Sequence, residues 1–98
     1  MWTGSLEFDL LLADVHSLKQ KRSVVRPLVA ELHRRFAVSA AESGHLGLHR
    51  RAAVGIAVVA ADRAHVVEAL DAAERMVAGR PEVQLLSTRR RILAGEDE

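Results

Sequence analysis

Basic side chains recur at helical spacing in the segment that begins at Ser17. The segment carries six lysines and arginines against a single acid, Glu31. Four of its basic residues are separated by three, four and seven positions, a spacing that places side chains on one face of a helix. These residues are Lys19, Arg22, Arg26 and His33. Such a cationic stripe matches the regular negative charge of a nucleic-acid backbone, so it predicts a phosphate-binding surface.

The same charges have a second explanation, which the sequence leaves open. A surface helix carries charged residues for solvation alone, and Arg34 and Arg35 also suit the negative C-terminal end of the helix dipole. Base stacking is not predicted, because RNA-binding sheets use aromatic residues on their exposed face. Of the three aromatic residues in this chain, Trp2 and Phe8 lie on the side of the first strand that is expected to face the core.

A second basic cluster, Arg89 to Arg91, falls in a predicted strand. Side chains alternate between the two faces of a strand, so the three arginines cannot all point the same way. Glu7 and Asp9 lie on the polar side of the first strand, and we expect them to pair with Arg89 or Arg91 across the sheet. The favoured interpretation is therefore structural, with ligand binding by these arginines as the alternative.

The segment from Arg51 to Ala61 is apolar on both alternating sides, which is typical of a central strand. One of these sides consists of small or β-branched residues, namely Ala53, Gly55, Ala57 and Val59. On a sheet face that no helix covers, such a patch is a candidate interface. It predicts a homodimer, or docking of another protein, as the alternative to nucleic-acid binding.

The sequence contains few features that indicate catalysis or metal binding. It lacks the nucleophile elbow, the P-loop and the zinc-protease motif. Without cysteine, it has no disulfide, thiolate ligand or cysteine nucleophile. His45 and His49 stand four residues apart in a predicted loop, but a metal site needs further converging ligands. We therefore expect no metal, no cofactor, no small-molecule substrate and no enzymatic activity.

Strands and helices must position all of these residues. Alternating apolar residues predict a long strand at 2–12, and the segment apolar on both sides predicts another at 51–61. We expect the last strand at 83–93, and small residues at 36–42 predict a short strand. Residues 43–50 contain two glycines and two histidines, and this composition predicts a loop.

Two segments have the features of helices. Ser17 and Gln20 have the form of a capping box at the start of the first helix, and Pro27 is expected to bend that helix without ending it. Asp62 can cap the second helix, which we expect to end at Gly79 in a left-handed conformation. Its inward stripe is predicted to be Val66, Leu70, Ala73 and Val77.

The resulting order predicts an α+β, ferredoxin-like βαββαβ sandwich. Its four-stranded antiparallel sheet carries both helices on one face, and the first and third strands are central. With 98 residues, 49% hydrophobic and 28% charged, we expect one domain, residues 1–93, and a disordered acidic tail, residues 94–98. No apolar run approaches the ~20 residues of a membrane helix and no signal peptide is evident, so we expect a cytoplasmic protein without membrane contact.

The segments HSLKQKR, from His16 to Arg22, and DRAHV, from Asp62 to Val66, carry a family resemblance. With VRPLVAELHRRF and the closing VQLLSTRRRIL, they resemble the bacterial YlxP-like family, a domain of unknown function. The resemblance implies a ferredoxin-like fold. It also implies a link to translation, because genes of this family tend to lie beside those for translation initiation and ribosome maturation factors. Pro27 and His49 depart from the family pattern.

Two hypotheses follow from these observations. The leading one is a non-catalytic accessory protein that contacts ribosomal RNA or a ribosomal subunit through the basic stripe of the first helix. The alternative is a homo-oligomeric interaction module that uses the open sheet face and has no nucleic-acid role. The sequence identifies neither the partner nor the oligomeric state.

Overall fold

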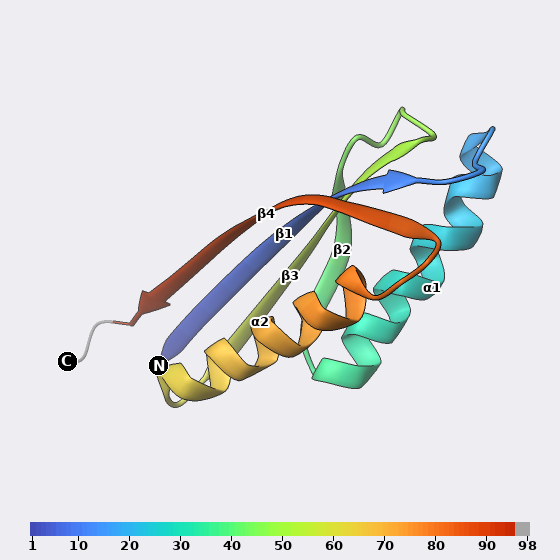
Figure 1. Ribbon diagram of the computed structural model, residues 1–98. Coiled ribbons are helices and arrows are strands. Elements are labelled where there is room, and N and C mark those ends of the chain that lie inside the picture. The colour runs from blue at the N-terminus through green and yellow to red at the C-terminus, as the bar shows by residue number, and fades with distance from the viewer. Residues whose placement is uncertain (96–98) are drawn as a thin grey trace.

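The computed structural model describes residues 1–95 and contains six elements in βαββαβ order (Figure 1). These elements are β1 (Trp2–Leu12), α1 (Leu18–Phe36), β2 (Ser39–Gly44), β3 (Arg51–Ala60), α2 (Arg63–Ala78) and β4 (Val83–Ala94). All strand pairs are antiparallel, and the sheet order is β2-β3-β1-β4. The predicted ferredoxin-like α+β fold is confirmed, with β1 and β3 in the centre of the sheet.

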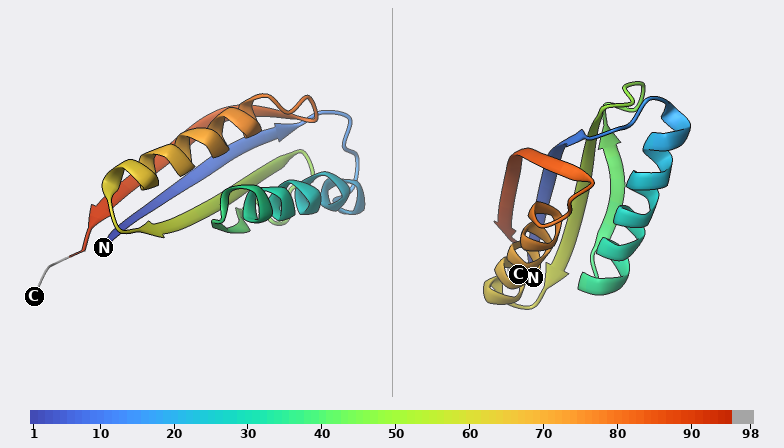
Figure 2. Two further views of the ribbon diagram at one scale, coloured as in Figure 1. Left: turned by 90° about the horizontal axis from the view of Figure 1, so that it is seen from below. Right: turned by 45° about the vertical axis from the view of Figure 1, so that its right-hand side comes forward.

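Both helices cover the same face of the sheet (Figure 2). Helix α1 contacts β2 and β3, whereas α2 contacts β1, β3 and β4. Alternation along β1 turns one set of side chains under the helices, and Leu6, Phe8, Leu10 and Leu12 are fully buried there. The predicted inward stripe of α2 is confirmed, because Val66, Leu70, Ala73 and Val77 are also fully buried.

Gly4 allows α2 to approach the sheet closely. A Cβ atom at this position would lie only 2.3 Å from Cγ1 of Val66 and 3.1 Å from Cδ1 of Leu70. Since both of those side chains are fully buried, they have little room to move away. The missing side chain on β1 therefore sets where the first turns of α2 pack.

The N-terminal caps that the sequence predicts are present. Gln20 donates its backbone N–H to Oγ of Ser17, as in a capping box, and Oε1 of Gln20 accepts from the backbone N–H of His16, the residue before the cap. The side chain of Asp62 accepts from the backbone N–H of His65 at the start of α2. Helix α1 runs through Pro27 without a break.

The bounds of one strand and one expected backbone conformation were wrong. The short strand was expected at 36–42, but α1 continues to Phe36 and ends at Ala37, whose φ of 53° is left-handed, so that β2 begins only at Ser39. Strand β2 then continues to Gly44, into the expected loop 43–50. Gly79 has a φ of −88°, and α2 therefore ends without the expected left-handed residue. At the C-terminus, Ala94 still belongs to β4. Residues 96–98 of the predicted acidic tail lie outside the described residues.

The molecule is elongated, with principal extents of 51 × 22 × 21 Å. Its length follows the long central strands, and the sheet face opposite the helices stays uncovered over much of this length (Figure 2). Within residues 1–95, neither helix combines the length and apolar character that a membrane span requires. The fold therefore presents two separate surfaces, the outer side of α1 and the open face of the sheet.

Candidate nucleic-acid interface and the open sheet face

Helix α1 presents four cations that no acid in the described chain neutralises. Lys19, Arg22 and Arg26, from the predicted stripe, are all exposed, and so is Arg34. None of these four side chains forms an ion pair within residues 1–95. We call Lys19, Arg22, Arg26 and Arg34 the basic surface of α1. These side chains form a row of exposed charge along α1, and Arg26 also lines a hollow between α1 and β2 with Ala40 and Glu42.

His33, the fourth residue of the predicted stripe, has a structural contact. Its Nδ1 atom lies 2.8 Å from the carbonyl oxygen of Val38, which is itself buried. The imidazole therefore connects the last turn of α1 to the segment that leads into β2. Its position at the end of the basic row is as predicted, but its ring also holds the turn in place.

Lys21 is basic in sequence but belongs to the core in space. Its residue exposure is 2%, and its Nζ atom donates to the carbonyl oxygens of His45 and Leu48, both at 2.7 Å. The same Nζ lies 2.7 Å from Oε2 of Glu42 in an ion pair. The ammonium group thus holds the loop between β2 and β3 against the first turns of α1. Sequence reasoning counted Lys21 only as one more surface charge.

A signal for this role exists in the sequence. Lys21 precedes Val25, Leu28 and Leu32 at intervals of four, seven and eleven residues, which is the spacing of the buried face of α1. A lysine in phase with an apolar stripe must bury its ammonium group, and a buried charge requires partners. The phase of Lys21 relative to the core, and not its charge, therefore identifies it as a structural residue.

Three residues of the segment HSLKQKR consequently serve the fold. Ser17 and Gln20 cap α1, and Lys21 holds the loop between β2 and β3. Lys19 and Arg22 are exposed and form no ion pair or side-chain hydrogen bond within residues 1–95. The fold therefore gives no structural reason for the positive charges of these two residues.

The arginine cluster of β4 is divided between the two faces of the sheet, as the alternation of a strand requires. Arg90 points toward the helices, where it pairs with Asp71 at 2.8 Å and with Glu74 at 3.2 Å. Arg89 and Arg91 stand on the open face, directly across from Glu7 and Ser5 of β1. Arg90 is therefore structural, whereas its two neighbours are exposed.

The acids of β1 pair differently from the expected arrangement. Nη2 of Arg51 donates to both carboxylate oxygens of Asp9, at 2.8 and 2.7 Å, and Nε2 of His45 lies 3.4 Å from the same group. The hydrogen bond from Arg51 holds the pKa of Asp9 below its ordinary value. Glu7 accepts a hydrogen bond of 2.7 Å from Ser43. Neither Arg89 nor Arg91 forms an ion pair within residues 1–95.

The predicted small-residue interface is only partly accessible. Ala53 is 7% exposed, and Gly55 is half-buried with Cβ and Oγ of Ser43 close above it. Ala57 and Val59 are exposed, Val59 at 65%. The bulged end of β2 therefore covers one end of the patch and leaves the other end open.

The register places open-face residues in rows that cross the sheet. One row consists of Ser39, Ala57, Ser5 and Arg91, taken from β2, β3, β1 and β4 in turn. The row on one side of it contains Val59, Thr3 and Leu93. The row on the other side contains Ala41, Gly55, Glu7 and Arg89.

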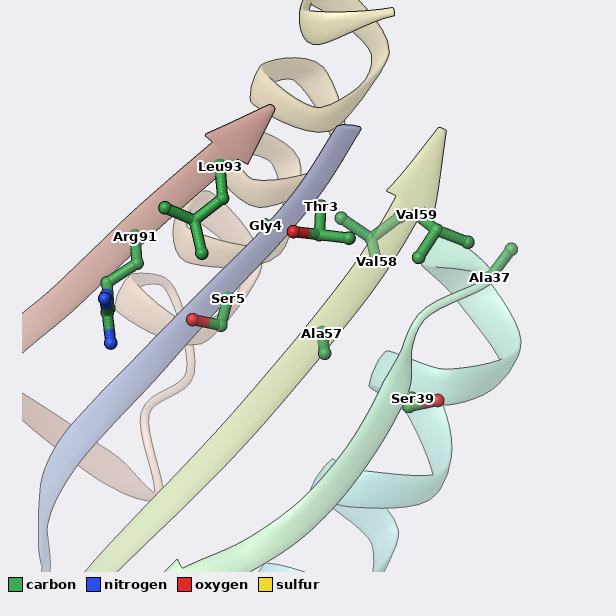
Figure 3. A pocket seen from close by; sticks show the side chains of 10 residues that line it. All are labelled: Thr3, Gly4, Ser5, Ala37, Ser39, Ala57, Val58, Val59, Arg91 and Leu93. Carbon is green, nitrogen blue, oxygen red and sulfur yellow. The ribbon is translucent and has the colours of Figure 1, made fainter. Parts of the chain in front are cut away.

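Two adjoining hollows of about 370 and 420 Å³ lie over these rows and share Ser5, Ser39, Ala57 and Arg91. We call them together the open-face trough. Figure 3 shows its end near Thr3, with Arg91 and Leu93 standing on β4 beside the low floor formed by Ser5 and Ala57. The trough is shallow and wide because its floor consists of short side chains.

Metal ligands do not converge in residues 1–95, where no group of three or more histidine, cysteine or acidic side chains is placed to hold an ion. The imidazole ring of His45 lies beside the carboxylate of Asp9, and the backbone carbonyl oxygen of His45 accepts a hydrogen bond from Nζ of Lys21. His49 is exposed at the end of the same loop. The two histidines thus occupy different environments.

An antiparallel βαββαβ sandwich with a basic outer helix and an open sheet face places this chain in the ferredoxin-like class of α+β proteins. The chain belongs to the family described as "Protein of unknown function (DUF503)", whose model matches residues 3–90. It is 29% identical over 86 residues to "Uncharacterized protein YlxP" of Bacillus subtilis (strain 168), which covers 88% of this chain and 94% of that protein. The predicted family resemblance is confirmed.

Proposed function

We propose that this protein is a non-catalytic accessory protein that binds structured RNA, with ribosomal RNA or a ribosomal subunit as its partner, through the basic surface of α1. The observation that carries this proposal is the row of exposed, unpaired cations on α1. Lys19 and Arg34 are fifteen residues apart, so the row extends for roughly 22 Å along the helix at ~1.5 Å per residue. A row of this length can follow several phosphates of one strand.

The charges of the neighbouring acids support the proposal. Glu31 is the only acid of α1, and it is neutralised by Arg80 of the segment after α2 and, at 3.4 Å, by Arg35. Arg80 also holds the pKa of Glu31 below its ordinary value, so the carboxylate is ionised and occupied. Glu42 is paired with Lys21. The outer side of α1 therefore keeps its positive potential.

The positions of the aromatic residues favour contact with phosphates over contact with bases. Phe8 is fully buried, and Trp2 and Phe36 pack against the core. No aromatic ring is therefore available for stacking on the open face of the sheet, where RNA-binding sheets present them. Binding through phosphates alone depends on the shape and charge of the RNA and only weakly on its sequence.

A homodimer through the open sheet face is the second candidate function. Val59 and Leu93 favour it, because they are 65% and 53% exposed and stand in the same row of the sheet. Sedimentation of the purified protein tests this candidate. A mass of two chains that returns to one chain in a Val59→Lys variant supports it, and a single-chain mass at all concentrations contradicts it.

Binding of ribosomal RNA and of purified small subunits at about 50 and 200 mM salt tests the RNA proposal. The variant Arg22→Glu plus Arg26→Glu should weaken binding and lower the slope of log affinity against log salt by about 2, one for each lost phosphate contact. The matched control is Arg63→Glu plus Arg75→Glu on α2, which makes the same change of charge at exposed positions without ion pairs in residues 1–95.

Retained binding in the α2 control, together with loss in the α1 variant, supports the proposal. Equal loss in both variants would show that only net charge matters. Absence of binding at the lower salt concentration would contradict any RNA role for α1. Circular dichroism of both variants shows whether the helices remain formed.

A further inference from the structure

The open-face trough contains two arginines that form no ion pair within residues 1–95. From its charge and shape, we propose that the trough binds an organic phosphate, with the phosphate group held by Arg89 and Arg91 and an apolar body lying on Val59 and Leu93. This site is separate from the basic surface of α1 and does not depend on RNA binding there.

Arg89 and Arg91 form no ion pair with the nearby acids. Glu7 stands directly across from Arg89 and keeps its negative charge, and its Oε2 accepts the hydroxyl of Ser43. Asp9 lies further along β1 and is held by Arg51 through both of its oxygens. With two arginines against Glu7, the β4 side of the trough carries a net positive charge.

The spacing of the donors suits a phosphate group. Arg89 and Arg91 are two residues apart on one face of β4, which places their Cα atoms roughly 6.8 Å apart. The long side chains at these positions can converge on one tetrahedral anion. Each guanidinium group can donate two parallel hydrogen bonds to phosphate oxygens. Ser5, across from Arg91, forms no side-chain hydrogen bond within residues 1–95. Its hydroxyl can supply a further donor.

The remaining surface of the trough determines what else the ligand must carry. Gly55 and Ala57 leave the floor low, and each hollow lies within the range of roughly 300–1,000 Å³ that is typical of small-molecule sites. Val59 and Leu93 form an exposed apolar end beside Thr3. A ligand with a phosphate at one end and an apolar or flat group at the other can contact both the arginines and the apolar end of the trough.

A phosphate monoester of this kind has two sources, a free phosphorylated small molecule or the terminal phosphate of a nucleic acid. Phenyl phosphate is a suitable probe for the shared chemistry, because it joins one phosphate to one flat apolar group. Inorganic phosphate tests the anion alone. A dinucleotide with and without a 5′-phosphate distinguishes the nucleic-acid end from a free small molecule.

The experiment is a nuclear magnetic resonance titration of the labelled full chain, followed through the backbone amides. Phenyl phosphate should shift the amides of Ser5, Ala57 and Arg91, and it should bind about tenfold more tightly than inorganic phosphate because its ring buries apolar surface. The variant Arg89→Gln plus Arg91→Gln should weaken binding about tenfold or more. Ala57→Leu should also weaken it, since a larger side chain fills the floor without changing the charge.

The matched control is Arg63→Gln plus Arg75→Gln on α2, which should leave the titration unchanged. If the 5′-phosphorylated dinucleotide binds more tightly than phenyl phosphate, the natural source is a nucleic-acid end, and if it does not, the source is a free small molecule. Shifts centred on α1, or shifts equally strong in the Arg89→Gln plus Arg91→Gln variant, would overturn the site. So would the absence of shifts in the trough at saturating phenyl phosphate.

Discussion

Lys21 stands among basic surface residues in the sequence and among core residues in the structure. Its ammonium group lies where α1, the end of β2 and the following loop meet, and it is bound there by two carbonyl oxygens and by Glu42. Burial of a single charge is costly unless its hydrogen-bonding capacity is used. The two hydrogen bonds of Nζ and its ion pair with Glu42 meet this requirement, so Lys21 holds the loop between β2 and β3 against α1.

Replacing Lys21 by methionine should lower the free energy of unfolding by about 3 kcal/mol, because the change leaves Glu42 and two loop carbonyls without their partner. Denaturant unfolding measures this loss. Lys19→Met, an exposed lysine two residues earlier, is the control and should change stability by less than about 0.5 kcal/mol. Similar stabilities for the two variants would contradict the structural role of Lys21.

Asp9 should make stability depend on pH. Its pKa is lowered first by the hydrogen bond from Arg51, with smaller contributions from the charges of Arg51 and His45. A carboxyl with a lowered pKa in the folded state stabilises the protein above its ordinary pKa, and this contribution is lost as pH falls below about 4. Unfolding free energies between about pH 6 and 3 should therefore fall less steeply in Asp9→Asn than in the parent chain. Identical profiles would contradict the pairing.

At the scale of the elements, Ala37 ends α1 in a conformation that suits glycine. Its φ of 53° crowds the Cβ atom, and this conformation costs roughly 1–2 kcal/mol for a residue with a side chain. We expect Ala37→Gly to raise the free energy of unfolding by about 0.5–1 kcal/mol, after allowance for the greater entropy of glycine in the unfolded chain.

Ala30→Gly is the matched control for this prediction. Ala30 is exposed in the middle of α1, so the change should lower stability by about 1 kcal/mol. Thermal or denaturant unfolding of the two variants measures both effects. A loss of stability in both would show that Ala37 is not strained.

The elements also show where a sequence pattern is a weak guide. Strand β1 has strong periodicity because alternate side chains are buried under the helices, and β3 is marked by a continuous apolar run. The small residues of β2 bury little surface, and Phe36 extends the stripe of α1, so the boundary between helix and strand was expected three residues too early. Pairing with β3 determines where β2 begins, and this contact is not encoded in the local pattern.

At the scale of the whole molecule, the two proposed surfaces lie on opposite sides of the sheet. The helices cover one face and the trough occupies the other, as Figures 2 and 3 show. Effects of substitutions at distant sites without shared partners are usually independent. The Arg22→Glu plus Arg26→Glu variant should therefore weaken RNA binding and leave the phenyl phosphate titration unchanged.

The variant Arg89→Gln plus Arg91→Gln should show the converse. It should weaken phenyl phosphate binding about tenfold or more and change RNA affinity by less than about twofold. Measuring both ligands with both variants makes this comparison. Loss of both activities in either variant would show that one continuous surface binds one ligand, and the two proposals would then have to be replaced by a single one.

The sequence by itself determined the order of the elements, the fold class, both N-terminal helix caps and the inward stripe of α2. Each of these depends on interactions between residues close together in the chain, or on a periodicity that burial on one side imposes. Helical spacing also predicted that Lys19, Arg22 and Arg26 share a face of α1. The structure adds Arg34 to this row, whereas the ring of His33 contacts Val38.

Only the tertiary structure decided the partners of the charged residues. Lys21 reaches Glu42, Arg51 holds Asp9, and Ser43 holds Glu7, so that Arg89 and Arg91 remain unpaired on the open face. Such pairs join strands that are distant in sequence, and their choice depends on register and on the path of one loop. A charge in a sequence has many potential partners of similar energy, and the fold selects among them by distance.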